Sequence, residues 1–172
     1  MGQGQTWGYT TAGEALTQLL LDVFRLNGRL LISGDRLVAD IGLTSARWQV
    51  LGAIGLAEAA LPVAHVARNM GLTRQAVQRI VNELAAEGLI EFAANPHYRR
   101  AKLVLLTAEG RRLYQAALQR QMPWVNGLAG FLDKEEIATA TYVIRTLVRQ
   151  LEESQAAPLD DRPAEKVRSS QK

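Results

Sequence analysis

The stretch VARNMGLTRQAVQRIVNELAAEGLI, residues 66–90, decides the fold of this chain. Its first apolar residues recur at helical spacing, and Gly71 interrupts that pattern. A second helix is expected from Thr73, which can cap free backbone N–H groups, to Gly88. Ala67 supplies a small residue four positions before the turn glycine, and an apolar anchor follows six positions after that glycine. Two short helices that cross at a tight turn need this spacing, so the stretch predicts a helix-turn-helix.

Two short, largely apolar segments follow and are expected to pair as a β-hairpin. Residues 89–93 and 101–106 have the composition of strands, and Asn95-Pro96 between them is a typical turn sequence. In the first helix of this motif, Pro62 suits a position in the first turn. Two helices followed by a hairpin form the pattern of a winged helix-turn-helix, and we assign this lobe to residues 42–106.

Helices are also expected on the N-terminal side of this lobe. Apolar residues at helical spacing over a wide arc predict a helix from about Thr11 to Ser33, and Gly34 is expected to end it. Thr44 can cap a further helix that ends near Gly55 or Ala57.

On the C-terminal side, Thr107 is expected to begin a helix that Pro123 kinks or ends. Asp133, three residues before Glu136, is expected to cap a final helix. Apolar residues in that helix alternate steps of three and four, as in a coiled-coil seam. These are Ile137, Ala140, Ile144, Leu147 and Leu151.

The outward face of the second helix carries the functional signal. A rotation of about 100° per residue groups Gln75, Gln78, Arg79 and Asn82 on the side away from Val77, Val81 and Leu84, with Arg74 at the helix start. Arginine, glutamine and asparagine have paired donors or acceptors that match guanine and adenine edges in the major groove. The helix has no acidic residue before Glu83. A solvated helix face is the alternative interpretation of these residues.

A second basic cluster lies near the hairpin tip, at Arg99, Arg100 and Lys102. Residues 62–106 hold six Arg or Lys against three Glu, and this surplus of three equals the net charge of the whole chain. Basic residues on a projecting loop can neutralise phosphates or enter a minor groove. The sequence therefore indicates double-stranded DNA as a partner, although a solvated turn is again the alternative.

Several other classes of protein are disfavoured by the sequence. The chain has no cysteine, which excludes disulfides and thiolate metal sites, and no apolar run of the roughly 20 residues that span a bilayer. Its start does not resemble a signal peptide, so we expect a cytoplasmic protein without a membrane partner. His65 and His97 lack neighbouring ligands at metal-binding spacing. We expect no cofactor, no metal and no catalytic activity, because no nucleophile–base set or nucleotide-binding motif is present.

The chain resembles the multiple-antibiotic-resistance regulator (MarR) family. GLTSARWQVL (residues 42–51), the opening stretch (66–90) and NPHYRRAKLVLLTAEGRRL (95–113) carry the resemblance, which extends from about residue 15 to 152. It implies a homodimer on a palindromic operator and often a small ligand that weakens DNA binding. It also implies DNA contacts by residues of the second helix and by a wing arginine. These are Thr73, Arg74, Gln75, Gln78 and Arg79, together with Arg99 or Arg100.

One departure concerns the wing, where family members commonly carry acidic residues ahead of the arginines and one of these orients an arginine. This sequence has Asn95, His97 and Tyr98 there instead. The effector pocket of the family lies between the dimer helices and the DNA-binding lobe, and Leu20, Phe24 and Trp48 could line such a pocket here.

The resulting expectation is a mainly α protein with a small β-hairpin wing. Residues 1–10 form a flexible arm, residues 11–154 one domain with dimerisation helices at 11–34 and 107–154, and residues 155–172 a disordered tail. The expected function is a dimeric, ligand-responsive repressor that reads a pseudo-palindromic operator. The alternative is a protein-interaction module that keeps the winged-helix shape without binding DNA.

Overall fold

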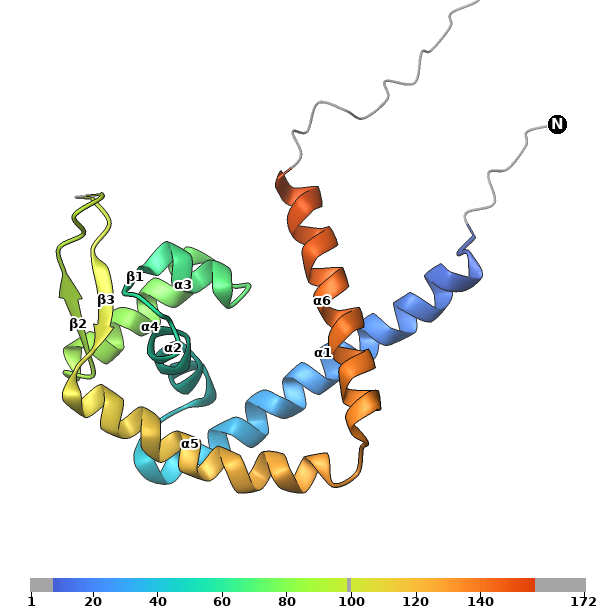
Figure 1. The fold of residues 1–172 in the computed structure, drawn as a ribbon, viewed down its shortest axis with the longest axis horizontal. Helices are drawn as coiled ribbons and strands as arrows, with labels where there is room; N and C mark the ends of the chain where they lie inside the picture. The colour runs from blue at the N-terminus through green and yellow to red at the C-terminus, as the bar shows by residue number, and fades with distance from the viewer. Residues whose placement is uncertain (1–7, 99, 157–172) are drawn as a thin grey trace, which may run out of the picture. The chain divides into compact units, whose positions relative to one another are not determined.

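A computed structural model describes residues 8–98 and 100–156, and its architecture is mainly helical with one small antiparallel sheet (Figure 1). The chain divides into two compact units, with the boundary in the sequence between Trp124 and Val125. The elements of the described chain are α1 (Thr11–Val38), the 3-10 turn η1 (Ala39–Ile41), α2 (Ser45–Gly55), β1 (Leu61–Pro62), α3 (Val63–Asn69), α4 (Arg74–Ala86), β2 (Ile90–Ala93), β3 (Leu103–Leu106), α5 (Ala108–Ala129) and α6 (Lys134–Ala156). The expected fold class, winged helix-turn-helix with additional long helices, is confirmed.

The helix boundaries of the lobe follow from local hydrogen bonds and backbone angles. The Thr73 hydroxyl accepts a hydrogen bond from the Ala76 N–H at 3.2 Å, and this cap begins α4. Gly71 and Gly88 have φ of +64° and +73°, a left-handed conformation that glycine adopts without the steric cost of a side chain. The predicted turn and the predicted end of the second helix are therefore both confirmed.

The sheet has three strands, one more than the predicted hairpin, in the order β1-β3-β2. Ile90 pairs with Leu106, and Ala93 pairs with Leu103. Leu61 and Pro62 add a short edge strand against β3. Pro62 therefore ends a strand and occupies the N-cap position of α3, without a capping hydrogen bond, rather than lying inside the first turn of the helix. Proline is tolerated there because an edge position does not need its missing N–H.

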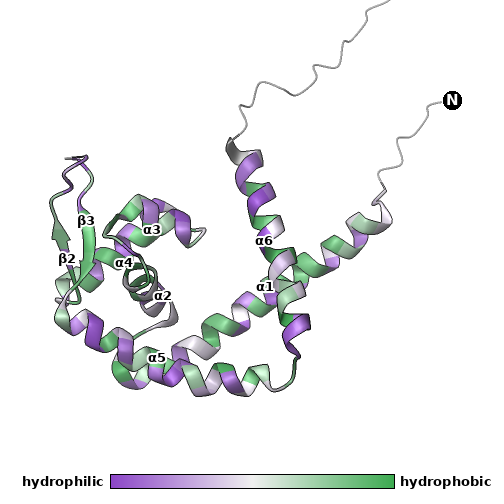
Figure 2. Ribbon diagram, in the orientation of Figure 1, coloured by the Kyte–Doolittle hydropathy of each residue, from purple (hydrophilic) through white to green (hydrophobic). Residues whose placement is uncertain are grey.

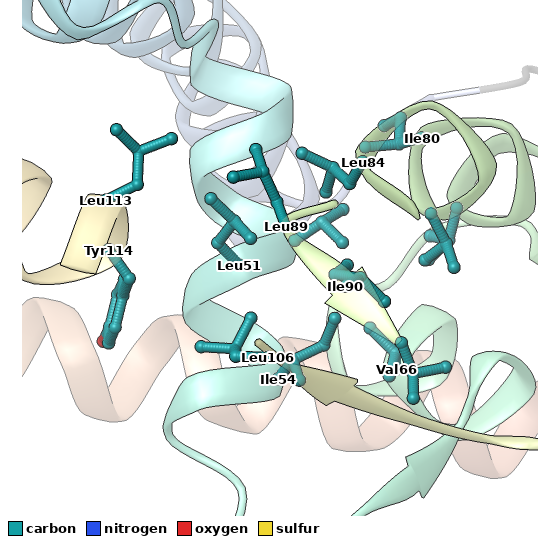
Figure 3. Packing of buried hydrophobic residues seen from close by; sticks show 14 of the residues in the cluster. Leu51, Ile54, Val66, Ile80, Leu84, Leu89, Ile90, Leu106, Leu113 and Tyr114 are labelled. Atoms are coloured by element: carbon teal, nitrogen blue, oxygen red, sulfur yellow. The ribbon is translucent and has the colours of Figure 1, made fainter. Parts of the chain in front are cut away.

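The core of the lobe forms where the apolar sides of α2, α3 and α4 meet the sheet and the first half of α5 (Figure 3). Leu51 and Leu84 are fully buried at its centre, and Ile90 and Leu106 come from the paired strands. Tyr114 of α5 closes one side of the cluster and is 5% exposed. This core fixes the inner side of α4, so the opposite side of that helix must face outward.

Helix α1 runs past the predicted stop at Gly34 and ends at Val38. Gly34 is buried inside the helix, and a Cβ added there would lie 2.6 Å from the Ser45 hydroxyl oxygen. The Asp35 carboxylate also accepts a hydrogen bond from the Ser45 N–H at 2.6 Å. Gly34 therefore permits close packing of α1 on α2, and the turn is made instead by Gly42, which has φ of +73°.

Helix α5 also continues past Pro123, to Ala129. Of the two predicted effects of this proline, a kink or the end of the helix, the second is therefore wrong. In the second unit, Asp133 and Glu136 form the predicted cap of α6. The Glu136 N–H donates to Asp133 Oδ1 at 2.7 Å, and the Asp133 N–H donates to Glu136 Oε2 at 3.0 Å. Helix α6 extends to Ala156, while most of the predicted arm and tail lies outside the described residues.

Candidate DNA-binding site

The outward face of α4 is polar and exposed. Gln75, Arg79 and Asn82 are exposed and Gln78 is half-buried, whereas the opposite side of the helix is buried in the core. The structure therefore brings these four side chains together on one face, with Arg74 in the first turn. A shallow hollow of about 530 Å³ over this face is lined by the same five residues.

Two pairs of side chains on this face are joined along the helix axis. Arg79 Nη1 donates to Glu83 Oε1 at 2.6 Å, and Gln78 Nε2 donates to Asn82 Oδ1 at 2.9 Å. Both pairs have i, i+4 spacing, at which helical side chains are neighbours. The arginine side chain is 70% exposed and the glutamate side chain 43% exposed. Exposed pairs of this kind contribute only about 0.3–0.5 kcal/mol, so either can open when a better partner arrives.

The turn of the wing is organised by Asn95. Its side-chain oxygen accepts hydrogen bonds from the backbone N–H groups of His97, at 3.0 Å, and Tyr98, at 3.2 Å. Asparagine favours turns because its side chain bonds to the backbone two or three residues on. One of the three residues that depart from the family pattern, Asn95, therefore shapes the backbone of the turn. Arg99 lies outside the described residues, and Arg100 is exposed.

Lys102 is held close to the wing by an aromatic ring. Its ammonium nitrogen lies 5.9 Å from the centre of the Phe92 ring, across the paired strands. At this distance the negative face of the ring attracts the cation. The contact keeps the charge of Lys102 beside the hairpin, although the side chain remains exposed.

A groove of about 1030 Å³ lies between the wing, α4 and the start of α3. Four predicted contact residues line it: Arg74, Gln78, Arg100 and Lys102. No carboxylate lines it among the residues that the structure describes. His65 and His97, which the sequence did not predict to contact DNA, are part of its wall. Their membership depends on how α3 packs beside the wing, which no local sequence signal reveals.

Two ion pairs join elements of the first unit. Arg47 of α2 pairs with Glu87 at the end of α4, which links the second helix of the motif to the rest of the lobe. The Arg120 guanidinium contacts the Asp40 carboxylate through Nε at 3.0 Å and Nη2 at 2.6 Å. These hydrogen bonds hold the pKa of Asp40 below its usual range. The second pair joins α5 to the turn after α1.

The three residues predicted to line an effector pocket are not adjacent within one chain. Phe24 is 71% exposed on α1, and Leu20 lies one turn before it. Trp48 instead packs near Gly34, ten residues further along α1. A rise of about 1.5 Å per residue separates Phe24 from this point by about 15 Å. A pocket that includes all three residues would need a further surface to bridge this distance.

The described part of the chain contains no cluster of three His, Asp or Glu side chains that could hold a metal ion. None of its helices is both long enough and apolar enough to cross a membrane.

Comparisons with known proteins agree with this geometry. A model of the MarR family matches residues 41–101, which include α2, α3, α4 and the first strand of the wing, β2. The uncharacterized protein Rv2011c of Mycobacterium tuberculosis is 38% identical over 135 residues, which cover 78% of this chain and 93% of that protein. The transcriptional activatory protein BadR of Rhodopseudomonas palustris is 25% identical over 138 residues, 78% of this chain and 79% of BadR.

Solved structures show the same fold beyond the helix-turn-helix. BpsR of Bordetella bronchiseptica, whose DNA binding is described as regulated by 6-hydroxynicotinic acid, superposes with a TM-score of 0.66 at 24% sequence identity. The match covers 76% of this chain and 98% of BpsR, so the long helices on both sides of the lobe belong to a known architecture. With the family model and a 38% identical relative over most of its length, the chain belongs to the MarR family of transcription regulators.

Proposed function

We propose that this regulator binds duplex DNA with α4 in the major groove and the wing on the adjacent backbone. The observation that carries the proposal is the outward face of α4, where amide and guanidinium groups stand opposite a completely apolar inner side. Arg74 belongs both to this face and to the groove beside the wing. With Arg100 and Lys102 in the same groove, a phosphate backbone between helix and wing would meet three cations.

The proposed contacts have two different roles. Gln75, Gln78, Arg79 and Asn82 would read base edges, because their paired donors and acceptors distinguish guanine and adenine. Thr73, Arg74, Arg99, Arg100 and Lys102 would hold the phosphates and set the register.

The proposed DNA-binding form is a homodimer. Helices α1 and α6 contain many hydrophobic residues along their length (Figure 2). Many of these side chains are exposed in the single chain. On α1 these include Leu16, Leu19, Leu20, Phe24 and Leu30, and on α6 Ile137, Ile144, Val148 and Leu151. Extended exposed apolar surface marks an interaction site. A second copy of the chain would place two recognition helices in successive major grooves, about 34–36 Å apart, on a pseudo-palindrome.

The test is selection of bound duplexes from a random DNA pool at two salt concentrations, with sedimentation of the protein at the same concentrations. The proposal expects a palindromic site, half-site centres about one helical turn apart and a dimeric mass. Alanine at Arg74, Gln78 and Arg79 together should abolish the selection. Full operator binding by this triple variant would refute the assigned face. A wild-type protein that enriches no sequence, even at low salt, would instead be an interaction module.

We further propose that the regulator is a repressor released by a small ligand. BpsR supports a ligand of small aromatic-acid size, whereas BadR is described as an activator. A reporter gene behind the selected site should therefore be less expressed when the protein is present, and increased expression would overturn repression.

The ligand pocket is tested by a fluorescence titration with small aromatic acids. If Trp48 lines the pocket, a compound that releases DNA should quench the tryptophan emission of the wild type more than that of Trp48→Phe. Equal quenching would place the ligand elsewhere.

A further inference from the structure

Glu83 is the only carboxylate on α4, and the DNA-binding proposal leaves it without a role. It belongs to the same side of the helix as Arg79, and its Oε1 accepts from Nη1 of that arginine at 2.6 Å. Both side chains are exposed, so the pair is not needed to fill the core. A carboxylate close to the phosphates of DNA is unfavourable because the two negative charges repel each other. Glu83 nevertheless lies beside Arg79, which is proposed to read bases.

The charge of Glu83 matters more than the strength of the pair. An exposed i, i+4 pair stabilises the closed form by about 0.3–0.5 kcal/mol, which is only about twofold in population. A paired Arg79 is neutralised locally, however, and contributes little to counterion release on DNA. Each arginine that does neutralise a phosphate makes the fall of log K with log salt steeper by about 0.9. Pairing thus weakens the sequence-independent part of binding.

Base contacts are affected differently. The guanidinium also has donors on Nη2 and Nε, and an arginine fork can make two hydrogen bonds to guanine O6 and N7. Such a bidentate contact discriminates against a wrong base by about 1–3 kcal/mol, which exceeds the energy of the pair with Glu83. A guanine can therefore bind Arg79 in place of Glu83, or together with it. A phosphate that contacts Arg79 provides much less free energy to replace the pair with Glu83.

We propose that Glu83 is a specificity-determining residue that acts through Arg79. It positions the guanidinium along the helix and opposes its transfer to phosphates, so that the charge of Arg79 is used at the correct base. This inference rests on the proposed DNA binding by α4. It assigns to Glu83 a role in the ratio of specific to non-specific affinity.

The experiment compares wild type with Glu83→Gln on two duplexes, the site selected from the random pool and a shuffled duplex of equal composition. The variant should bind the shuffled duplex more tightly, with a salt slope steeper by about 0.9, and its specificity ratio should fall about three- to tenfold. Glu109→Gln is the matched control. It makes the same charge change and breaks the Glu109–Arg112 pair on α5, and it should leave the ratio unchanged.

The variants are also made in an Arg79→Ala background. There Glu83→Gln should alter affinity for both duplexes equally and leave the ratio unchanged, because no guanidinium remains to be positioned. An equal fall of the ratio in both backgrounds would overturn the proposal and make Glu83 a base reader on its own. An unchanged ratio in the wild-type background would also overturn it. Failure of the wild type to prefer its selected site would instead refute DNA recognition by α4. Unfolding temperatures should be nearly the same for Glu83→Gln, Glu109→Gln and Arg79→Ala, because each changes an exposed side chain and leaves the core intact.

Discussion

Gly110, in the first turn of α5, is the position where one added methyl group should have the largest effect. A Cβ built there would lie 2.0 Å from the backbone carbonyl oxygen of Leu89. The same carbonyl accepts a hydrogen bond from the Thr107 N–H at 3.1 Å, and the Thr107 hydroxyl donates to the Gly88 carbonyl at 2.7 Å. The start of α5 is thus locked onto the chain that leads from α4 into β2.

Gly110→Ala has two opposing effects on stability. Alanine favours a helix over glycine by about 1 kcal/mol. Against this, an approach of 2.0 Å is about 1.5 Å shorter than a comfortable contact, and a backbone carbonyl cannot rotate aside as a side chain can. Overpacking costs about 3 kcal/mol at the upper end, and a shift of α5 would weaken a hydrogen bond of Thr107 by about 1 kcal/mol. The net expectation is a loss of about 3 kcal/mol.

Urea unfolding at a fixed protomer concentration measures this loss, because the stability of a dimer depends on concentration. Gly127→Ala is the matched control on the same helix, since a Cβ at that position meets no atom within 4 Å in the single chain. The control should be neutral or stabilising by up to about 1 kcal/mol. A Gly110→Ala protein as stable as wild type would show that α5 is free to move away from Leu89, and would refute the reasoning.

Three further outcomes are expected. Asp40→Asn should lower the unfolding temperature at neutral pH, because a carboxylate whose folded pKa is lowered stabilises the fold above its unfolded pKa of about 3.9. This difference should vanish as the pH falls through the lowered pKa, and an equal difference at pH 7 and pH 2 would contradict the pairing with Arg120. In binding titrations, Arg79→Ala should reduce operator affinity about tenfold or more, with little change in affinity for shuffled DNA. Arg100→Ala should weaken binding to both duplexes and flatten the salt slope by about 0.9. The reverse pattern would exchange the roles of the two arginines. Leu51→Ala should cost about 2–5 kcal/mol in urea unfolding because it leaves a cavity in the core, and a loss below 1 kcal/mol would mean that the core collapses around it.

Much of the lobe could be predicted from the sequence because its signals are local. Thr73 caps α4 through a bond that spans three residues, and Gly71 makes a turn that needs only its own backbone freedom. The outward grouping of the α4 side chains depends only on helical periodicity. The predicted helix end at Gly34 is wrong because the role of this glycine is not local. It allows close contact with Ser45, which lies eleven positions later in the sequence.

By itself the sequence determined the order of the helices and the wing, the polar face of α4 and the family to which the chain is similar. Only the tertiary structure decided that β1 joins the sheet, that the wing and α4 enclose a groove, and that α5 is locked at Gly110. The pairing of Arg79 with Glu83 lies between these cases, since i, i+4 spacing permits the contact but side-chain rotamers must form it. Periodicity and capping act within a few residues, whereas packing depends on which distant surfaces come to share one core.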